Sequence, residues 1–381
     1  MATERSVDLA RTITSVASAQ GEIVVYRLYD LGYEIDLDRS FALLGDRAPA
    51  RARPARGEAQ AIQIPNPPVT ASLGTALLAV GGDTRTVELS ARVFDFGVVS
   101  LRGRLDVPRP VPWPQFLAVA PSWANAPEWK EIFQKARATL LERIQPAIIK
   151  PGDAPVTEDY VVYRIHRLLD ADNRRLPVAA LRDDDVSQLL TGESRPLSAT
   201  ARRDLLSQRF SYFEDDLTAL TWNAALVVEP VVEDSDVQYV IEFANAQLLE
   251  LRYYDALLDD ELPRMYDGIR EARHGFHLFG RHYSRMLANL QTRIAEVTEL
   301  VERSENALKM TDDMFLARIY AAALELFRGG VWRQGIDEKL AIVRDAYSML
   351  NAETQARRAE ILEIIVVLLI TLEIVLAFWR H

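Results

Sequence analysis

The stretch ILEIIVVLLITLEIVLAFW, residues 361–379, decides how this chain is organised. Fourteen of its nineteen residues are Leu, Ile, Val or Phe, and as a helix it would be about 28 Å long, close to the thickness of the hydrocarbon core of a bilayer. Trp379 at one end and Arg357–Arg358 at the other suit the two membrane interfaces. The stretch predicts a single C-terminal transmembrane helix. A buried core helix or a coiled-coil strand is the alternative, because Glu363 and Glu373 are unusual in a lone span.

The expected topology is that of a tail-anchored protein. Residues 1–20 have no apolar core of a secretory signal and predict a flexible polar lead-in. Arg357–Arg358 beside the predicted span favours a cytoplasmic soluble part. We therefore expect a single-pass protein of the inner or cytoplasmic membrane, in contact with membrane lipids.

Polar residues inside the apolar stretch indicate self-association. An ionised carboxylate cannot face lipid, so Glu373 is expected to be protonated or to face a protein partner. One span per chain offers no partner helix of its own, which predicts a homo-oligomer. The candidate membrane and oligomer residues are Glu363, Thr371, Glu373 and Trp379.

Heptad-like apolar spacing fills the region before the stretch. From about residue 235, apolar residues recur at alternating spacings of four and three, a pattern typical of coiled coils. Pro263 and Gly329–Gly330 interrupt the pattern, so the predicted helices cover 235–262, 264–310, 312–328 and 332–379. Antiparallel helices packed within one chain would explain the first of these seams as well as oligomerisation does, and both are expected.

The first part of the chain predicts an α+β domain with a mainly antiparallel sheet. Strand patterns and helix patterns follow one another, with strands over 22–37, 84–105, 156–168 and 208–230 and helices over 125–145 and 183–207. The expected division is a lead-in over 1–20, the α+β domain over 21–232, a helical stalk over 233–356 and the membrane anchor over 357–381.

Composition excludes several classes of function. The 381 residues include no Cys, which excludes disulfides, thiol catalysis and Cys-ligated metals. The net charge of −11 argues against a sequence-specific nucleic-acid binder. A basic loop, GDRAPARARPARG at residues 45–57, is a candidate partner-binding segment, or else a solvated loop. Its cations are Arg47, Arg51, Arg53 and Arg56.

The chain has few signs of catalysis, so we expect no enzyme and no cofactor. Phosphate-binding glycine patterns, the G-x-S-x-G elbow and H-E-x-x-H are all missing from the sequence. Glu271, His274 and His277 share one helix face and form a weak candidate for half of a di-metal site. A di-metal bundle needs a second such motif, which the sequence does not supply, and a metal-dependent enzyme is therefore the third-ranked function.

Residues 240–267, VIEFANAQLLELRYYDALLDDELPRMYD, resemble the Required for Meiotic Nuclear Division family. The match rests on Gln247, Leu248, Leu249, Glu250, Leu251, Arg252, Tyr253, Tyr254 and Asp255, followed by long helices and an acidic, apolar tail. The resemblance implies a C-terminally anchored membrane protein that forms large homo-oligomers, with mitochondrial relatives that hold ribosomes near the membrane. It implies no catalytic residue.

The expected function is that of a tail-anchored, homo-oligomeric membrane scaffold. Its cytoplasmic domain would recruit a ribosome or another protein. The alternative is an oligomeric channel or transport assembly, in which Glu373 of each subunit faces the pore.

Overall fold

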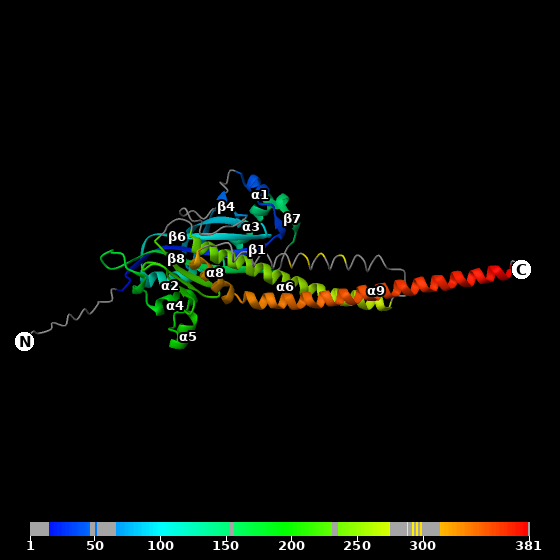
Figure 1. The fold of residues 1–381 in the computed structure, drawn as a ribbon. Coiled ribbons are helices and arrows are strands. Elements are labelled where there is room, and N and C mark those ends of the chain that lie inside the picture. Colours follow the sequence, from blue (N-terminus) through cyan, green and yellow to red (C-terminus); the bar gives the residue numbers. More distant parts are fainter. Residues whose placement is uncertain are drawn as a thin grey trace, which may run out of the picture. The chain divides into compact units, whose positions relative to one another are not determined.

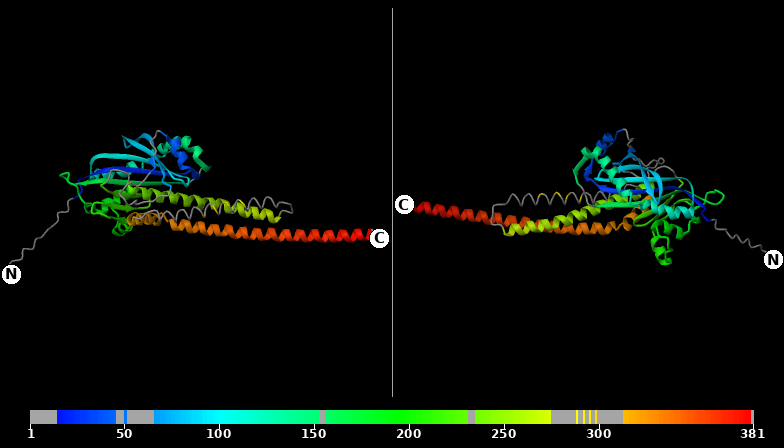
Figure 2. Two further views of the ribbon diagram at one scale, coloured as in Figure 1. Left: turned by 45° about the horizontal axis from the view of Figure 1, so that its top comes forward. Right: turned by 180° about the vertical axis from the view of Figure 1, so that it is seen from behind.

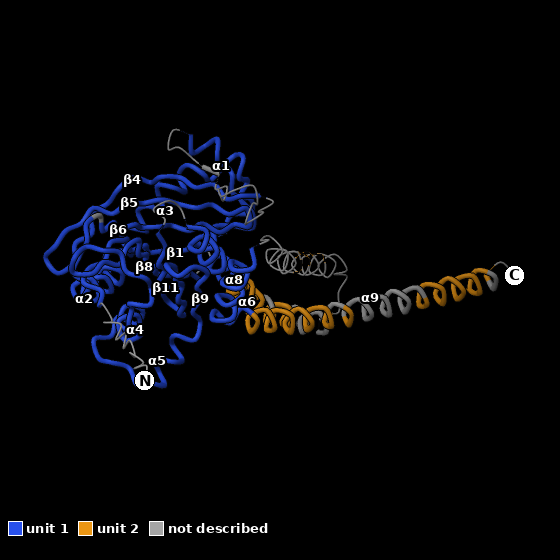
Figure 3. The backbone as a smooth tube through the Cα atoms, turned by 60° about the vertical axis from the view of Figure 1, so that its left-hand side comes forward, with its two compact units in different colours: residues 1–250, 307–329 blue, residues 251–306, 330–381 orange. Residues whose placement is uncertain are grey.

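The computed structural model describes residues 15–45, 50–51, 66–152, 156–230, 235–274 and 313–379, and the single positions 288, 292, 295 and 298. The chain divides into two compact units (Figure 3). Unit 1 comprises residues 1–250 and 307–329, and unit 2 comprises residues 251–306 and 330–381.

A large mixed sheet forms the centre of unit 1 (Figure 1). Within the described residues its strand order is β3-β4-β5-β6-β1-β8-β11-β10-β9, and only the pair β8–β11 is parallel. A separate pair joins β2 to β7. The strands are β1 (Ser18–Asp30), β2 (Gly32–Ile35), β3 (Ala50–Arg51), β4 (Val69–Val80), β5 (Asp83–Val93), β6 (Val98–Pro112), β7 (Ile148–Pro151), β8 (Thr157–Leu169), β9 (Arg209–Phe210), β10 (Leu217–Leu220) and β11 (Ala224–Val228).

Helices cover both faces of this sheet (Figure 2). In unit 1 they are α1 (Leu37–Leu44), α2 (Trp113–Ala124), α3 (Trp129–Ile144), α4 (Asp183–Thr191), α5 (Ala199–Leu205) and α8 (Met314–Leu326), with short 3-10 turns at Gln145–Ala147 and Val178–Ala180. The long helices α6 (Asp236–His274) and α9 (Gly329–Trp379) continue into unit 2.

The two sheet faces have different chemistry. On β1, Ile23 and Val25 belong to the apolar core that contains the aromatic residues of α2 and α3. The even-numbered residues of this part of β1 point to the opposite face. There the Tyr26 hydroxyl accepts a hydrogen bond from the Gln238 side chain of α6. Both faces of β1 are buried, and its sequence therefore does not alternate regularly between apolar and polar residues.

Close packing fixes the position of α3 on the sheet. The Trp129 ring lies where a Cβ on Gly103 of β6 would stand, 2.2 Å from the nearest ring atom. The Trp129 indole N–H donates to the carbonyl of Trp123 at 2.9 Å, so its polar atom is satisfied although the side chain is buried.

In unit 2, α6 and α9 pack side by side. Their shared core consists of Leu251, Tyr254, Leu258, Ile336 and Leu340. Arg252 lies over the Trp332 ring at 5.9 Å, and further along both helices Lys339 contacts Asp259 at 2.6 Å. The residue numbers of the contacting side chains therefore increase in the same direction along both helices, so the two helices run parallel here.

The antiparallel packing expected for the first seams involves a predicted helix over 264–310, most of which lies outside the described residues, so the α6–α9 pair does not test it. The heptad pattern identifies which residues face a neighbour but is equally compatible with either direction. One correction concerns Pro263, which the sequence predicts to separate two helices. The helix α6 continues through it to His274. Pro263 is exposed, so water can satisfy the carbonyl that loses its helical donor.

The main architectural prediction is confirmed, since the chain has an α+β fold with a large mixed sheet and helices. Among the helices within the described ranges, none combines the length and the apolar character that crossing a membrane requires.

Candidate functional site

The last part of α9 exposes apolar side chains on every side of the helix. The side chains described without interruption are those of residues 363–376, and all of them are exposed. Eleven of the fourteen are large and apolar, with exposed fractions between 45% for Val366 and 62% for Leu368. Since single exposed apolar residues are ordinary but a continuous apolar surface is not, this end of α9 is a candidate interaction surface.

The predicted membrane and oligomer residues lie on this surface. Glu363, Thr371 and Glu373 are exposed, and Trp379 is 90% exposed. The Thr371 hydroxyl donates to the Val367 carbonyl at 2.7 Å, so the helix itself satisfies it. Of the two carboxylates in the apolar stretch, that of Glu373 lies nearer the middle.

Other predicted site residues lie partly outside the described structure. Glu271 and His274 belong to the last turn of α6, but their side chains are not described, and His277 is outside the described residues. In the part of the chain that the structure does describe, no three His, Asp or Glu side chains are placed to hold a metal ion. Of the basic loop, Arg47, Arg53 and Arg56 lie outside the described residues, and only the backbone of Arg51 is described, in β3.

The motif at residues 247–255 has a structural role in α6. The side chains of Gln247, Leu248, Leu249, Glu250, Leu251 and Tyr254 are buried. Gln247 accepts a hydrogen bond from the Tyr320 hydroxyl of α8, and Asp255 accepts one from Lys339 at 2.7 Å. Arg252 lies over the Trp332 ring, and the Tyr253 ring meets the Tyr254 ring edge-on.

A buried layer of charge lies between the sheet and α6 in unit 1. Arg92 pairs with Glu242, and its guanidinium lies 4.7 Å above the Tyr239 ring. Arg164 contacts Glu22 at 3.0 Å and Glu229 at 2.7 Å. Burial raises the pKa of the Tyr26 phenol in this layer, and the charge of Glu242 adds to the effect. Each carboxylate here faces a cation, so the layer holds charged side chains in fixed positions.

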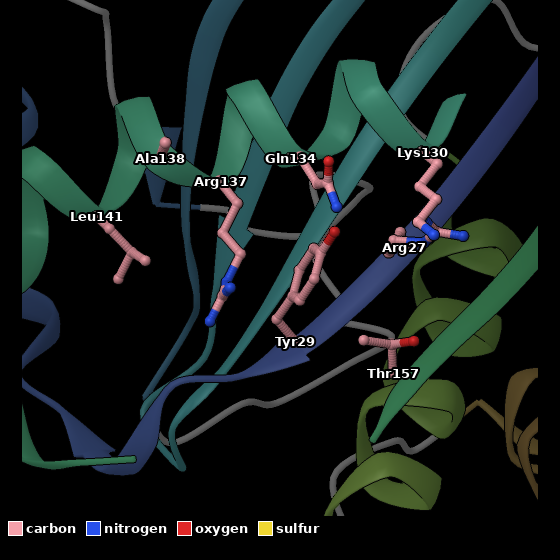
Figure 4. Close-up of a pocket in the computed structure, with 8 residues that line it drawn as sticks. All are labelled: Arg27, Tyr29, Lys130, Gln134, Arg137, Ala138, Leu141 and Thr157. Atoms are coloured by element: carbon pink, nitrogen blue, oxygen red, sulfur yellow. The ribbon is translucent and has the colours of Figure 1, made fainter. Parts of the chain in front are cut away.

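A cationic pocket of about 620 Å³ opens on the opposite face of the sheet, and it was not predicted from the sequence. Figure 4 shows its lining, with Lys130, Gln134 and Arg137 on α3 reaching towards Arg27 and Tyr29 on β1. The remaining lining residues are Ala138, Leu141 and Thr157. No carboxylate lines this pocket in the described structure.

Two of the cations of the pocket have defined contacts. Arg27 forms two hydrogen bonds with Asp159, at 2.6 and 2.7 Å, and Arg137 lies 5.0 Å from the centre of the Tyr29 ring. Burial raises the pKa of the Tyr29 phenol, while the charges of Arg27 and Arg137 oppose the shift. The sequence carries a signal for the helical side of the pocket, because 130, 134, 137 and 141 share one face of a helix.

Comparison with known proteins corrects the resemblance drawn from residues 240–267. Residues 20–235 match the family described as "Uncharacterized protein MJ0711, N-terminal domain". A curated relative, "Uncharacterized protein MJ0711" from Methanocaldococcus jannaschii, is 21% identical over 192 residues, which cover 50% of this chain and 58% of the relative. The comparison found no solved structure that matches the chain.

The resemblance to the Required for Meiotic Nuclear Division family is therefore wrong. It depended on a leucine-rich helical segment whose residues are explained by the packing of α6, and such segments recur in unrelated helical proteins. The ribosomal partner, which was inferred from that resemblance, stays an untested expectation. The matched region contains all the strands of the described sheet except part of β1, and by this match the chain belongs to the MJ0711 N-terminal domain family.

Proposed function

We propose that this protein is a membrane-attached, homo-oligomeric scaffold, held at the bilayer by the apolar end of α9. The observation that carries the proposal is the exposure of eleven large apolar side chains over residues 364–376. At about 25 cal/mol per Å² of apolar surface, leaving such a surface in water is costly, so it needs an apolar covering.

A lipid bilayer is the covering that these residues favour. Apolar side chains point in every direction around α9, whereas a helix that packs on one protein neighbour needs only one apolar stripe. Trp379 continues the surface and has the amphipathic ring that favours the headgroup level. In this proposal the stretch 361–379 is the attachment, and the α+β domain is the part that meets soluble partners.

Self-association follows from Glu373 in the same proposal. Its carboxylate interrupts an apolar surface, and in lipid it requires a proton or a polar partner. A second copy of α9 supplies that partner, since Thr371 and Glu373 recur in each copy.

The test is flotation of the full chain with liposomes, followed by alkaline-carbonate extraction. The test variant replaces Val367, Leu368 and Leu372 with Gln. The matched control replaces Leu77, Met314 and Val331, which are also large, apolar and exposed, with Gln. We expect wild type and control to float and to resist carbonate, and the test variant to stay in the soluble fraction.

Two results would overturn the proposal. Full-length protein that remains soluble and forms the same oligomer without lipid would show that other copies cover the apolar end. Ion flux through liposomes containing wild type, abolished by Glu373→Leu, would instead support the channel.

A further inference from the structure

We propose that the cationic pocket on unit 1, lined by Arg27, Lys130 and Arg137, binds a small organic phosphate. Nothing in this inference depends on membrane attachment, because the pocket lies wholly within residues 27–157.

The charge of the pocket selects an anion. Among the lining residues that the structure describes, three are cations and none is acidic. Arg27 already engages Asp159, which lies next to the pocket, so this pair is close to neutral. Glu131, the nearest acidic neighbour of Lys130 in sequence, bonds Lys135 at 2.7 Å. Lys130 and Arg137 add two further positive charges to the lining.

The arrangement of donors favours a group with several oxygens. Lys130 lies in the first turn of α3, where the helix dipole adds partial positive charge. Gln134 and Thr157 add an amide and a hydroxyl on the two sides of the pocket. An ammonium, a guanidinium and neutral donors that converge on one space form the set that phosphate oxygens prefer.

The remaining lining residues accommodate an organic body. Tyr29, Ala138 and Leu141 provide apolar surface beside the cations. A volume of about 620 Å³ is in the range of pockets that bind small organic molecules and is larger than inorganic phosphate requires. We infer that the ligand is a phosphate ester whose apolar portion contacts Tyr29 and Leu141.

The experiment is calorimetric titration of the full chain with inorganic phosphate, phenyl phosphate and benzyl alcohol at physiological ionic strength. Phenyl phosphate is expected to bind at least about tenfold more tightly than inorganic phosphate, and benzyl alcohol is expected not to bind. Dihexanoyl phosphatidic acid in the same titration distinguishes a lipid headgroup from a free phosphate ester.

Three variants test the assignment to this pocket. Lys130→Glu is expected to weaken phenyl phosphate binding by at least about a hundredfold, and Arg137→Lys by about tenfold, because Lys cannot form the guanidinium fork. Arg143→Glu is the matched control, since Arg143 lies on the same helix and is exposed but does not line the pocket. It is expected to change binding by less than about twofold.

The proposal fails if wild type binds none of the phosphates. It fails equally if Arg143→Glu weakens binding as much as Lys130→Glu, because general attraction to a positive surface would then explain the result. Lys130 is exposed, so its replacement leaves the folded core intact, and this variant remains informative even if Arg137→Lys lowers stability.

Discussion

Arg92 on β5 and Glu242 on α6 form an ion pair across 150 residues of sequence, with side chains that are only 4% and 0% exposed. The pair joins the sheet to the helix that enters both units. Removing charged groups from water is costly, and each member compensates the other only while both are present.

We therefore expect Glu242→Gln and Arg92→Met each to lower the free energy of unfolding by about 3–5 kcal/mol, because each leaves a buried group with a lost partner. The double variant Arg92→Met, Glu242→Leu should recover most of that loss. Urea denaturation measures the effect.

The matched control for the buried pair is Arg85→Met. Arg85 pairs with Asp83 on the same strand at 3.0 Å, but both side chains are more than half exposed. Arg85→Met should therefore lower the free energy of unfolding by less than about 1 kcal/mol. If Arg92→Met and Arg85→Met lowered the free energy of unfolding equally, burial would not explain the effect at Arg92.

The buried Asp30 carboxyl should make stability depend on pH. Burial raises the pKa of Asp30 to about 7, although the Gly32 N–H donates to it at 3.1 Å. A raised carboxyl pKa means that the native state holds the proton more tightly than the unfolded state, so stability falls as pH rises from about 4 to 7.

Asp30→Asn should remove this dependence. Relative to wild type, the free energy of unfolding of the variant is expected to rise by about 2–3 kcal/mol between pH 5 and pH 8. Thermal or urea unfolding across that range provides the measurement. A difference that stays constant with pH would show that Asp30 does not titrate there.

Gly97 should not tolerate a side chain. Its φ is +95°, and a Cβ would lie 1.8 Å from the Gly32 carbonyl oxygen. Gly82 has a φ of +87° with nothing within 4 Å of a Cβ, so it has the same backbone conformation without the clash.

Gly82→Ala is therefore expected to cost about 1–2 kcal/mol, the penalty for the left-handed region alone. Gly97→Ala should lower the free energy of unfolding clearly more than Gly82→Ala does. The difference between the two values measures the steric effect of the close approach between Gly97 and Gly32. Similar melting temperatures for the two variants would contradict the packing of this turn.

In unit 2, Lys339 should stabilise the pairing of α6 with α9. Burial lowers the pKa of its ammonium, but the hydrogen bonds and charges of Asp255 and Asp259 more than offset this and raise the pKa overall. Because the pKa is raised, the contribution is present below the unfolded pKa and disappears as pH rises through the folded value.

Lys339→Met should weaken this pairing by about 1 kcal/mol, since the three side chains remain partly exposed. Hydrogen exchange should quicken in residues 251–262 of α6 while the sheet of unit 1 is unaffected. Faster exchange throughout the sheet would instead point to global destabilisation.

The sequence predicts the elements of this protein better than their arrangement. The pattern around Asp95–Gly97 predicts two strands, and β5 and β6 flank that turn. The strand over 156–168 corresponds to β8. The helix α1 and the strand β4 were missed, because α1 has only eight residues and the β4 side chains do not follow a regular alternation of buried and exposed positions.

The sequence by itself determined the α+β class, the long helices and the apolar end of α9, because these follow from local periodicity and hydropathy. Only the tertiary structure decided that Arg92 meets Glu242, that α6 and α9 run parallel, and that Arg27, Lys130 and Arg137 line one pocket. Side chains far apart in sequence become neighbours through strand order and helix packing. Neither of these is encoded in the spacing of residues along one segment.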